Sequence, residues 1–476
     1  MANPGDVTVG LIAGRGEGPL EVVIAGGGVA GLEALLALHE LAGPRVRVDL
    51  LAPEREYVYR PLAVAEPFRL ARPARVDLAE VAAQHGARHR RDSLASVEAA
   101  GRKLRTKSGR LLRYDALLLA VGARPVEAVH GALTFRGPAD VEAFGGLLDE
   151  LARGKVHSVV FAAHSRVRWP LPLYELALLS AAHLESRGVR GIEWKLVTHE
   201  RAPLEILGTR ASRAVVELLE NGGIEILTGR VPHMATAGRL VLDDGDSLEV
   251  ERVVALPELQ VPFIPGVPRG PGGFVPTDGL CRVKGLDRVF AAGDATSFPI
   301  KQGGLAAQQA DTAGAMIAKL AGAPVDPRPP DLRLRAALLT GSAPRFLRAT
   351  LSNREATSTA GRSVLWWPPG KIAARYLAPY IAARTQGGAP PPLDDVEALF
   401  GEEAEVAEAD RTAALELALT AADADAGWRD YESALKWLGV AEKLNVTLPP
   451  VYAKKREDWT RGLDRLRMGE TRHANP

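Results

Sequence analysis

A glycine-rich segment near the N-terminus limits the fold of this chain more than any other feature. Residues 26–31 read G-G-G-V-A-G and fit the pattern G-x-G-x-x-G, between a short apolar run and apolar residues at helical spacing. Gly26 allows a tight turn, Gly28 lets the backbone approach a pyrophosphate, and Gly31 lets the helix pack closely on the strand. Phosphates are favoured where Ala30 and its neighbours begin the helix, because the first N–H groups are free there. The segment therefore predicts a dinucleotide site.

The acidic residue that often binds the ribose in such units is displaced. The second apolar run ends at Leu51, and Ala52 and Pro53 follow it, so that the first carboxylate is Glu54. Either Glu54 binds the ribose hydroxyls, or backbone groups and water do so. The alternative is that Glu54 is a solvated loop residue.

Composition excludes several classes of protein. The 476 residues are enough for about three compact units, and 59 basic against 58 acidic residues argue against a nucleic-acid-binding protein. The single cysteine, Cys281, rules out an internal disulfide and a cysteine redox pair, and we interpret it as a structural residue of a surface hairpin. Histidines show no metal-ligand spacing, so no metal site is predicted. A signal-peptide pattern and long apolar runs are missing, which predicts a cytoplasmic protein.

The pattern of apolar residues indicates an α/β protein with two similar halves. Strands are expected at 21–25, 46–51, 116–121, 158–162, 193–198, 224–228 and 289–292, and helices at 32–41, 76–85, 172–186, 211–221 and 305–320. Hairpins are expected at 104–113 and 240–250. Proline-rich breaks at 323–330 and 387–392 separate a mostly helical C-terminal part.

Two further motifs follow the glycine segment. Residues 114–125 (Y-D-A-L-L-L-A-V-G-A-R-P) and 289–295 (V-F-A-A-G-D-A) each read as a strand that ends in a tight turn. At these residues the chain resembles the FAD-dependent pyridine nucleotide-disulfide oxidoreductases, flavoproteins with two dinucleotide-binding domains. The resemblance covers residues 20–320. It implies that FAD is the cofactor, that Gly122 lies where the two domains join, and that Gly293 and Asp294 contact the ribityl chain and the pyrophosphate.

The second half departs from that family. Where a second glycine motif is expected, residues 161–175 read F-A-A-H-S-R-V-R-W-P-L-P-L-Y-E, without glycine. Side chains and prolines there would obstruct a pyrophosphate, so we predict weak or no NAD(P)H binding. Arg166 and Arg168 either bind a phosphate in another way or lie on the surface of a degenerate loop, and Thr198 offers only a weak ribose contact. The pattern is similar to the branch of sulfide:quinone oxidoreductase, flavocytochrome c sulfide dehydrogenase and type II NADH dehydrogenase-like proteins, but without its redox cysteines.

Several residues are candidates for the flavin end of the site. Lys301 and Gln302 precede the helix at 305–320. The resemblance implies that this segment lies at the flavin, where positive charge would stabilise the reduced form. The resemblance implies that Glu175 faces the flavin and that Arg60 lies close to FAD. We therefore predict Glu175 and Lys301 as catalytic residues, with an ordinary helix surface and a basic helix start as the respective alternatives.

The predicted architecture is two Rossmann-like domains with a C-terminal interface region and a helical appendage. The expected parts are a flexible lead (1–19), a discontinuous FAD domain (20–130 and 250–325), a degenerate NAD(P)-type domain (131–249), the interface region (326–392) and the appendage (393–476). Residues 371–383 are expected to be helical, with Ile372, Tyr376 and Tyr380 on one face and Lys371 opposite. That face, with Trp366 and Trp367, either rests on a membrane surface or packs on the FAD domain.

Two functions remain open from the sequence. The first is an FAD-dependent oxidoreductase that passes electrons from NAD(P)H or another small reductant to a quinone-like or other small acceptor. The second is a flavin-binding scaffold without enzymatic activity, whose second domain and helical tail bind a protein. The sequence indicates neither the identity of a partner nor an oligomeric state.

Overall fold

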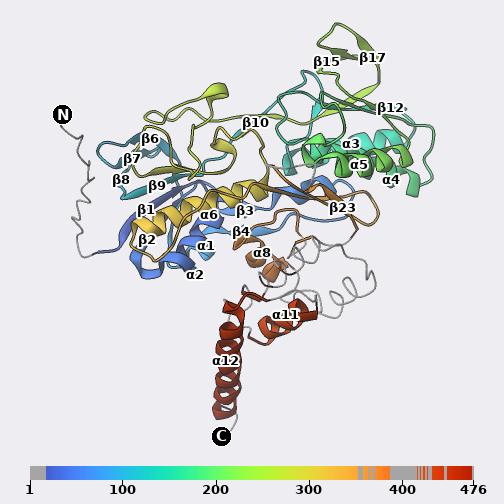
Figure 1. The fold of residues 1–476 in the computed structure, drawn as a ribbon. Helices are drawn as coiled ribbons and strands as arrows, with labels where there is room; N and C mark the ends of the chain where they lie inside the picture. Colours follow the sequence, from blue (N-terminus) through green and yellow to red (C-terminus); the bar gives the residue numbers. More distant parts are fainter. Residues whose placement is uncertain are drawn as a thin grey trace, which may run out of the picture.

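The computed structural model describes residues 18–351, 357–362, 365–366, 370–385, 431–443 and 448–473, and the single positions 415, 419, 422, 423 and 426. The described residues do not include most of the expected lead, Trp367, Trp428, residues 386–392 or most of residues 393–430. The fold is α/β with two parallel sheets, as the sequence predicts (Figure 1).

The first sheet has five parallel strands in the order β20-β9-β1-β2-β5. Their bounds are Val289–Ala291, Ala116–Leu119, Leu20–Ala25, Val46–Leu51 and Arg88–Arg90. Val22 and Ile24 pack against helices α1 (Val29–Ala42) and α6 (Gly303–Leu320), whereas Val23 and Ala25 face the antiparallel sheet β6-β7-β8 (Leu94–Glu98, Lys103–Thr106 and Leu111–Arg113). Both faces are covered, which explains why these strands are continuous apolar runs.

The second sheet repeats this plan with the order β11-β18-β12-β13-β14. Its strands are Leu133–Thr134, Arg252–Ala255, Ser158–Ala163, Glu193–Thr198 and Ile224–Leu227. The helices α3 (Val141–Ala152), α4 (Leu171–Ser186) and α5 (Thr209–Asn221) follow β11, β12 and β13 along the chain. On the opposite face Val160 and Ala162 pack with the antiparallel sheet β15-β16-β17 (Pro232–Thr236, Arg239–Leu242 and Ser247–Glu249).

One expected domain boundary needs correction. Residue 250 onward is expected in the first domain, but strand β18 pairs in parallel with β12 of the second sheet. The boundary therefore lies after Ala255. The apolar run of β18 indicates a buried strand, and nothing in such a run says which of two sheets the strand joins. The antiparallel pair β10 (Arg124–Val126) and β19 (Glu258–Gln260) connects the two halves.

The remaining short elements complete the first half. Strands β3 (Glu56–Val58) and β4 (Arg75–Asp77) form an antiparallel pair ahead of helix α2 (Leu78–Gln84). Asp77 caps α2 by accepting the N–H groups of Ala79 and Glu80. No helix among the described residues is both long enough and apolar enough to cross a membrane.

The C-terminal part begins with an antiparallel sheet of three strands. These are β21 (Arg333–Leu338), β22 (Arg345–Thr350) and β23 (Thr359–Gly361). Leu338 and Leu347 belong to the same apolar core as Leu178 of α4. Gly341, in the turn between β21 and β22, lies against Ala182 of α4, so that this sheet is seated on the second half.

The expected helix 371–383 is shorter than the sequence suggests. Helix α8 comprises only Leu377–Thr385, and Ile372 lies ahead of it. Ile372, Leu377 and Tyr380 are buried in the core that contains α1. The expected apolar face therefore packs on the first half and is not available to a membrane. Lys371, expected on the polar face, is itself buried.

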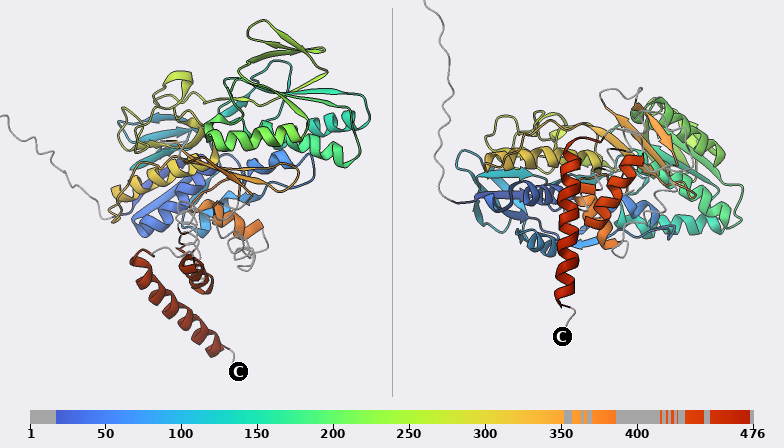
Figure 2. Two further views of the ribbon diagram at one scale, coloured as in Figure 1. Left: turned by 45° about the vertical axis from the view of Figure 1, so that its right-hand side comes forward. Right: turned by 60° about the horizontal axis from the view of Figure 1, so that its bottom comes forward.

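The helical appendage has a small core of its own. Trp437 and Leu438 of α11 (Tyr431–Lys443) pack with Tyr452 and Trp459 of α12 (Val451–His473). Tyr431 and Leu435 lie at the edge of this core, while Trp437 is almost completely buried. Helix α12 extends away from the rest of the molecule (Figures 1 and 2).

Candidate functional site

A cavity of about 1000 Å³ opens at the carboxyl ends of the strands of the first sheet, and we call it the main cavity. The segments that follow β1, β2, β9 and β20 line one side of it, including residues 25–30, 120–125 and 292–294. Residues 167–169 and 171–172 of the second half and 371–372 of the C-terminal part are among its other lining residues. Parallel sheets place their ligands at this edge.

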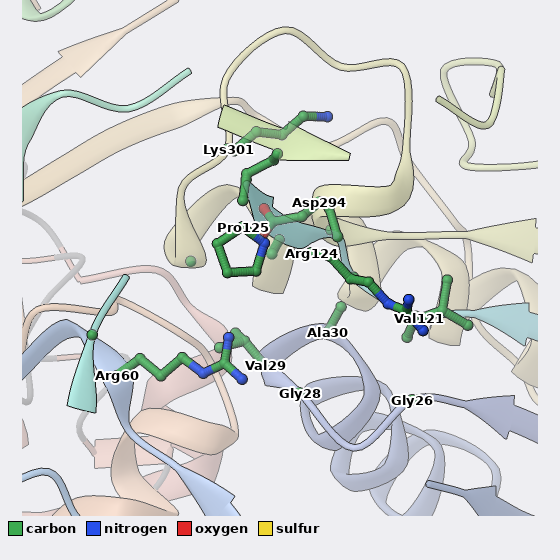
Figure 3. A pocket seen from close by; sticks show the side chains of 18 of the residues that line it. Gly26, Gly28, Val29, Ala30, Arg60, Val121, Arg124, Pro125, Asp294 and Lys301 are labelled. Carbon is green, nitrogen blue, oxygen red and sulfur yellow. The ribbon is translucent and has the colours of Figure 1, made fainter. Parts of the chain in front are cut away.

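The three glycines of the first motif have different surroundings. A Cβ atom on Gly26, whose φ is +122°, would lie 2.0 Å from the carbonyl oxygen of Ala120, and one on Gly31 would lie 1.9 Å from that of Gly26. A Cβ atom on Gly28 would meet nothing within 4 Å. Gly26, Gly28 and Ala30 line the main cavity, whereas Gly31 does not and instead packs α1 on β1. The space beside Gly28 is thus open toward the N-terminus of α1 (Figure 3).

We expect Gly31→Ala to destabilise the protein even without any ligand. The added methyl group would collide with the backbone of Gly26, which cannot move without shifting β1, at a cost of about 2–3 kcal/mol. Gly28→Ala, which adds its methyl group in open space, is the matched control. Its free energy of unfolding should lie within about 0.5 kcal/mol of that of the parent protein. Denaturant titration of the cofactor-free proteins measures both values. Equal midpoints for the two variants would contradict the packing role of Gly31.

Most other predicted cofactor-binding residues line the main cavity as well. Gly122 and Gly293 do so with positive φ angles of +64° and +79°, which suit glycine. Asp294 follows Gly293, and burial raises the pKa of its carboxyl group, an effect that Lys301 opposes. Glu54 and Arg60 line the cavity as exposed side chains.

Basic side chains predominate in the cavity wall. Its cations are Lys107, Arg60, Arg124, Arg136, Arg168, Lys301 and Lys371, and its anions are Glu54, Glu56 and Asp294. In Figure 3 the side chain of Arg60 extends toward Val29, whereas that of Arg124 extends toward Val121. This charge distribution suits an anionic ligand such as a pyrophosphate.

Lys301 and Gln302 stand at the start of α6, as predicted. The amide oxygen of Gln302 caps the helix by accepting the N–H group of Leu305 at 2.8 Å. The Nζ atom of Lys301 donates to the carbonyl oxygen of Thr296 at 2.5 Å and lies 4.1 Å from the centre of the Phe274 ring. Burial lowers the pKa of Lys301 to about 8. Both residues line the main cavity.

Glu175 does not face the cavity, in contrast to the prediction. Its side chain is 0% exposed and is paired with Lys371, whose own side chain is 8% exposed. The Glu175 carboxylate also accepts the N–H group of Leu339 at 2.9 Å. Burial raises the pKa of Glu175 and lowers that of Lys371, and each partner opposes the shift of the other. Lys371 lines the cavity, so Glu175 reaches it only through this lysine.

Sequence reasoning missed Lys371 because the pair joins residues 196 positions apart. No local pattern marks a lysine whose partner lies so far along the chain. Arg136 also lines the cavity, and its guanidinium binds the buried Asp140, which lies only four residues further along the chain.

The degenerate loop of the second half forms part of the cavity wall. Val167, Arg168 and Trp169 line the main cavity ahead of α4, which starts with Leu171 and Pro172. Arg166 is paired with Glu258 and donates to the carbonyl oxygen of Ala128, so its guanidinium is already engaged. Of the two arginines, therefore, Arg168 alone lines the cavity.

The end of strand β13 is closed by internal hydrogen bonds. The hydroxyl groups of Tyr174 and Thr198 donate to the Glu200 carboxylate at 2.6 and 3.0 Å, and all three side chains are buried. The ribose contact expected of Thr198 is thus replaced by a bond to Glu200. Burial raises the pKa of Glu200 to about 7.

This carboxyl group should make stability depend on pH. Because the pKa of Glu200 is raised from 4.5 to about 7 in the folded protein, the folded state binds more protons than the unfolded state between these values. The contribution of Glu200 to the free energy of unfolding is therefore complete below pH 4.5. It decreases by about 3 kcal/mol as the pH rises toward 7. We expect Glu200→Gln, which still accepts both hydroxyl groups, to remove this slope. Denaturant titrations from pH 4 to 8 test it, and an unchanged slope would contradict it.

Cys281 lies in a turn that the antiparallel bridge Thr277–Val283 closes, in keeping with the expected hairpin, but its side chain is buried and not on the surface. It is 4% exposed, with a φ of +62°, and it packs in the core of the first half. Burial raises the pKa of its thiol to about 12, so the thiolate is disfavoured, in keeping with a structural role.

Part of the chain is similar in sequence to known proteins. Residues 20–160 match the family model of the pyridine nucleotide-disulphide oxidoreductases. An NADH dehydrogenase-like protein of Mycobacterium tuberculosis is 27% identical over 290 residues, which are 57% of this chain and 72% of that protein.

Solved structures share the fold. The sulfide:quinone oxidoreductase of Aquifex aeolicus superposes with a TM-score of 0.66 at 18% identity, over 80% of this chain and 96% of that chain. A ferredoxin reductase of Rhodopseudomonas palustris gives 0.51 at 21% identity, over 69% and 82%.

Proposed function

Because the chain belongs to the pyridine nucleotide-disulphide oxidoreductase superfamily, we propose that it is an FAD-dependent oxidoreductase that transfers electrons to a quinone-like or other small acceptor. The observation that carries the proposal is the open space beside Gly28, at the N-terminus of α1 and within a wall rich in basic side chains. That combination fits a pyrophosphate.

The residues of the main cavity suit the other parts of FAD. Gly26, Gly28 and Ala30 would hold the pyrophosphate, with Arg60 close by. Glu54 would contact the ribose. A further group, Gly122, Gly293 and Asp294, would lie along the ribityl chain and the flavin. Gly31 supports the motif by packing and makes no contact of its own.

When bound, FAD would supply the two-electron chemistry that side chains lack. The start of α6 would give a positive potential at the flavin end, since its first N–H groups and Lys301 both lie there. Gln302 would keep that helix end in place through its bond to Leu305. Negative charge that develops at this end is therefore stabilised.

A proton route is offered by the pair of Glu175 and Lys371. The Nζ atom of Lys371 would hold a proton at the cavity wall, where an acceptor that gains electrons needs one. The Glu175 carboxylate, bound to Lys371 on the buried side, would keep the lysine charged against the effect of burial. Glu175 thus acts through Lys371 and not at the flavin itself.

NAD(P)H is a poor candidate for the electron donor at the usual site of the second domain. Leu171 and Pro172 replace a glycine turn, Arg166 is bound to Glu258, and Thr198 is bound to Glu200. We expect a dissociation constant above about 100 µM for NADH and NADPH by calorimetry. A low-micromolar value would make the protein a conventional NAD(P)H-dependent reductase.

The function is tested by spectroscopy of the purified protein. We expect flavin absorbance at about one FAD per chain, as isolated or after incubation with FAD. Anaerobic reduction by dithionite, followed by a soluble quinone, should restore the oxidised spectrum. A chain that takes up no flavin would refute the cofactor, and a flavin that the quinone does not reoxidise would refute the acceptor.

A further inference from the structure

A short segment that closes one side of the main cavity is tied down at both ends. Lys371 and Ile372 line the cavity, and the N–H group of Ile372 donates to the hydroxyl of Tyr59 at 2.8 Å. Gly303, at the start of α6, lies so close that a Cβ atom there would be 2.9 Å from Ile372. The position of Lys371 therefore depends on how residues 370–377 are held.

The far end of the segment is held by Glu33. This residue lies on α1 and is 0% exposed. Its two carboxylate oxygens accept the N–H groups of Tyr376 and Leu377 at 2.9 and 2.6 Å. These donors belong to the start of α8, where N–H groups have no partner within the helix and a negative charge is favoured.

A second carboxyl group supports Glu33 from α6. The side chain of Asp311 is hydrogen-bonded to that of Glu33, and burial raises the pKa of both groups. Two buried carboxyl groups in contact cannot both be ionised without a large cost, so the pair holds a proton between them. Arg375, in the same segment, lowers the pKa of Asp311 through its charge. Helices α1 and α6 thus hold the start of α8 together.

Glu33 does not line the main cavity, and the proposed cofactor contacts do not use it. Burial of a carboxylate is unfavourable unless hydrogen bonds replace its lost hydration. The backbone N–H groups that bind Glu33 belong to the segment that carries Lys371. We infer that Glu33 is a positioning residue, which fixes the start of α8 so that Lys371 reaches Glu175 at the wall of the cavity. The role assigned to Lys371 rests on the proposed function, but its position does not.

The test compares three variants. Glu33→Leu keeps the side-chain volume but accepts no hydrogen bond. Glu33→Gln keeps one acceptor oxygen and can donate to Asp311. Glu40→Gln, at an exposed position of the same helix, is the control.

The first measurement is hydrogen–deuterium exchange of residues 370–377 in the FAD-free protein. We expect exchange to rise about tenfold or more in Glu33→Leu, to rise less in Glu33→Gln and to stay unchanged in Glu40→Gln. If Glu33→Leu does not fold, a rise of about threefold in Glu33→Gln is the expected result. Unchanged exchange in the folded Glu33 variants would overturn the inference.

The second measurement is the pH dependence of flavin reoxidation by a soluble quinone in the FAD-loaded variants. A displaced Lys371 should shift this profile, with partial recovery in Glu33→Gln. Faster exchange with an unchanged profile would show that Glu33 is only structural and would overturn its positioning role. If the parent protein binds no FAD, the proposed function fails, while the exchange data still decide whether Glu33 holds the segment.

Discussion

Gly28→Val should abolish FAD binding while leaving the cofactor-free protein folded. The backbone of Gly28 is extended, with φ −84° and ψ −167°, a conformation that valine adopts readily. A Cβ atom there meets no protein atom within 4 Å, so the side chain would occupy only the space that a pyrophosphate needs. We expect a loss of affinity of at least about 1000-fold, measured as flavin retained after dialysis and by fluorescence titration of the apoprotein with FAD.

Gly146→Val is the matched control for this variant. Gly146 lies in α3, where an added Cβ atom also meets nothing within 4 Å, and it does not line the main cavity. This variant should bind FAD like the parent protein. Stoichiometric FAD in Gly28→Val, with an unchanged melting curve, would show that the glycine motif is not the cofactor site.

Lys371→Met should lower the free energy of unfolding by about 3–5 kcal/mol. The substitution leaves the fully buried Glu175 carboxylate without its cation, and the N–H group of Leu339 is then its one hydrogen-bond partner among the described residues. The double variant Glu175→Gln/Lys371→Met removes both charges and should recover most of the loss, because no buried charge then remains unpaired. Urea titration of the four proteins of this cycle gives the coupling energy.

A surface ion pair provides the comparison. Lys195 lies 3.6 Å from Glu225 and 3.8 Å from Glu193, and its side chain is 26% exposed. Lys195→Met should cost no more than about 1 kcal/mol. A similar small loss for Lys371→Met would mean that Glu175 and Lys371 are not a buried pair in solution.

The sequence predicts those parts of the structure that depend on neighbours along the chain. The strand, turn and helix around Gly26 follow from local geometry, and a Cβ atom on Gly31 meets its own turn. Parallel strands that are buried on both faces are continuous apolar runs in the sequence. The strands that contain Val22 and Leu51 can therefore be predicted without knowledge of the tertiary fold.

What the sequence does not predict depends on contacts between distant segments. The sequence points to Glu175 as a candidate, but its partner Lys371 comes from a segment whose helical spacing indicates a polar surface. Leu377 does begin a helix, yet Ile372 ahead of it is held by a bond to Tyr59, 313 residues away. Amphipathic spacing indicates which side chains need cover and does not indicate what covers them.

The packing of strands β21 and β22 on α4 has a consequence for synthesis on the ribosome. Leu338 and Leu347 complete the apolar core that contains Leu178 of α4, and about 160 residues separate the end of α4 from the end of β22. At a synthesis rate of 5–20 residues per second, this side of α4 stays exposed for about 8–30 s before the strands that cover it, β21 and β22, are complete. Holdase chaperones that bind apolar helices could bind the exposed side of α4 during that interval.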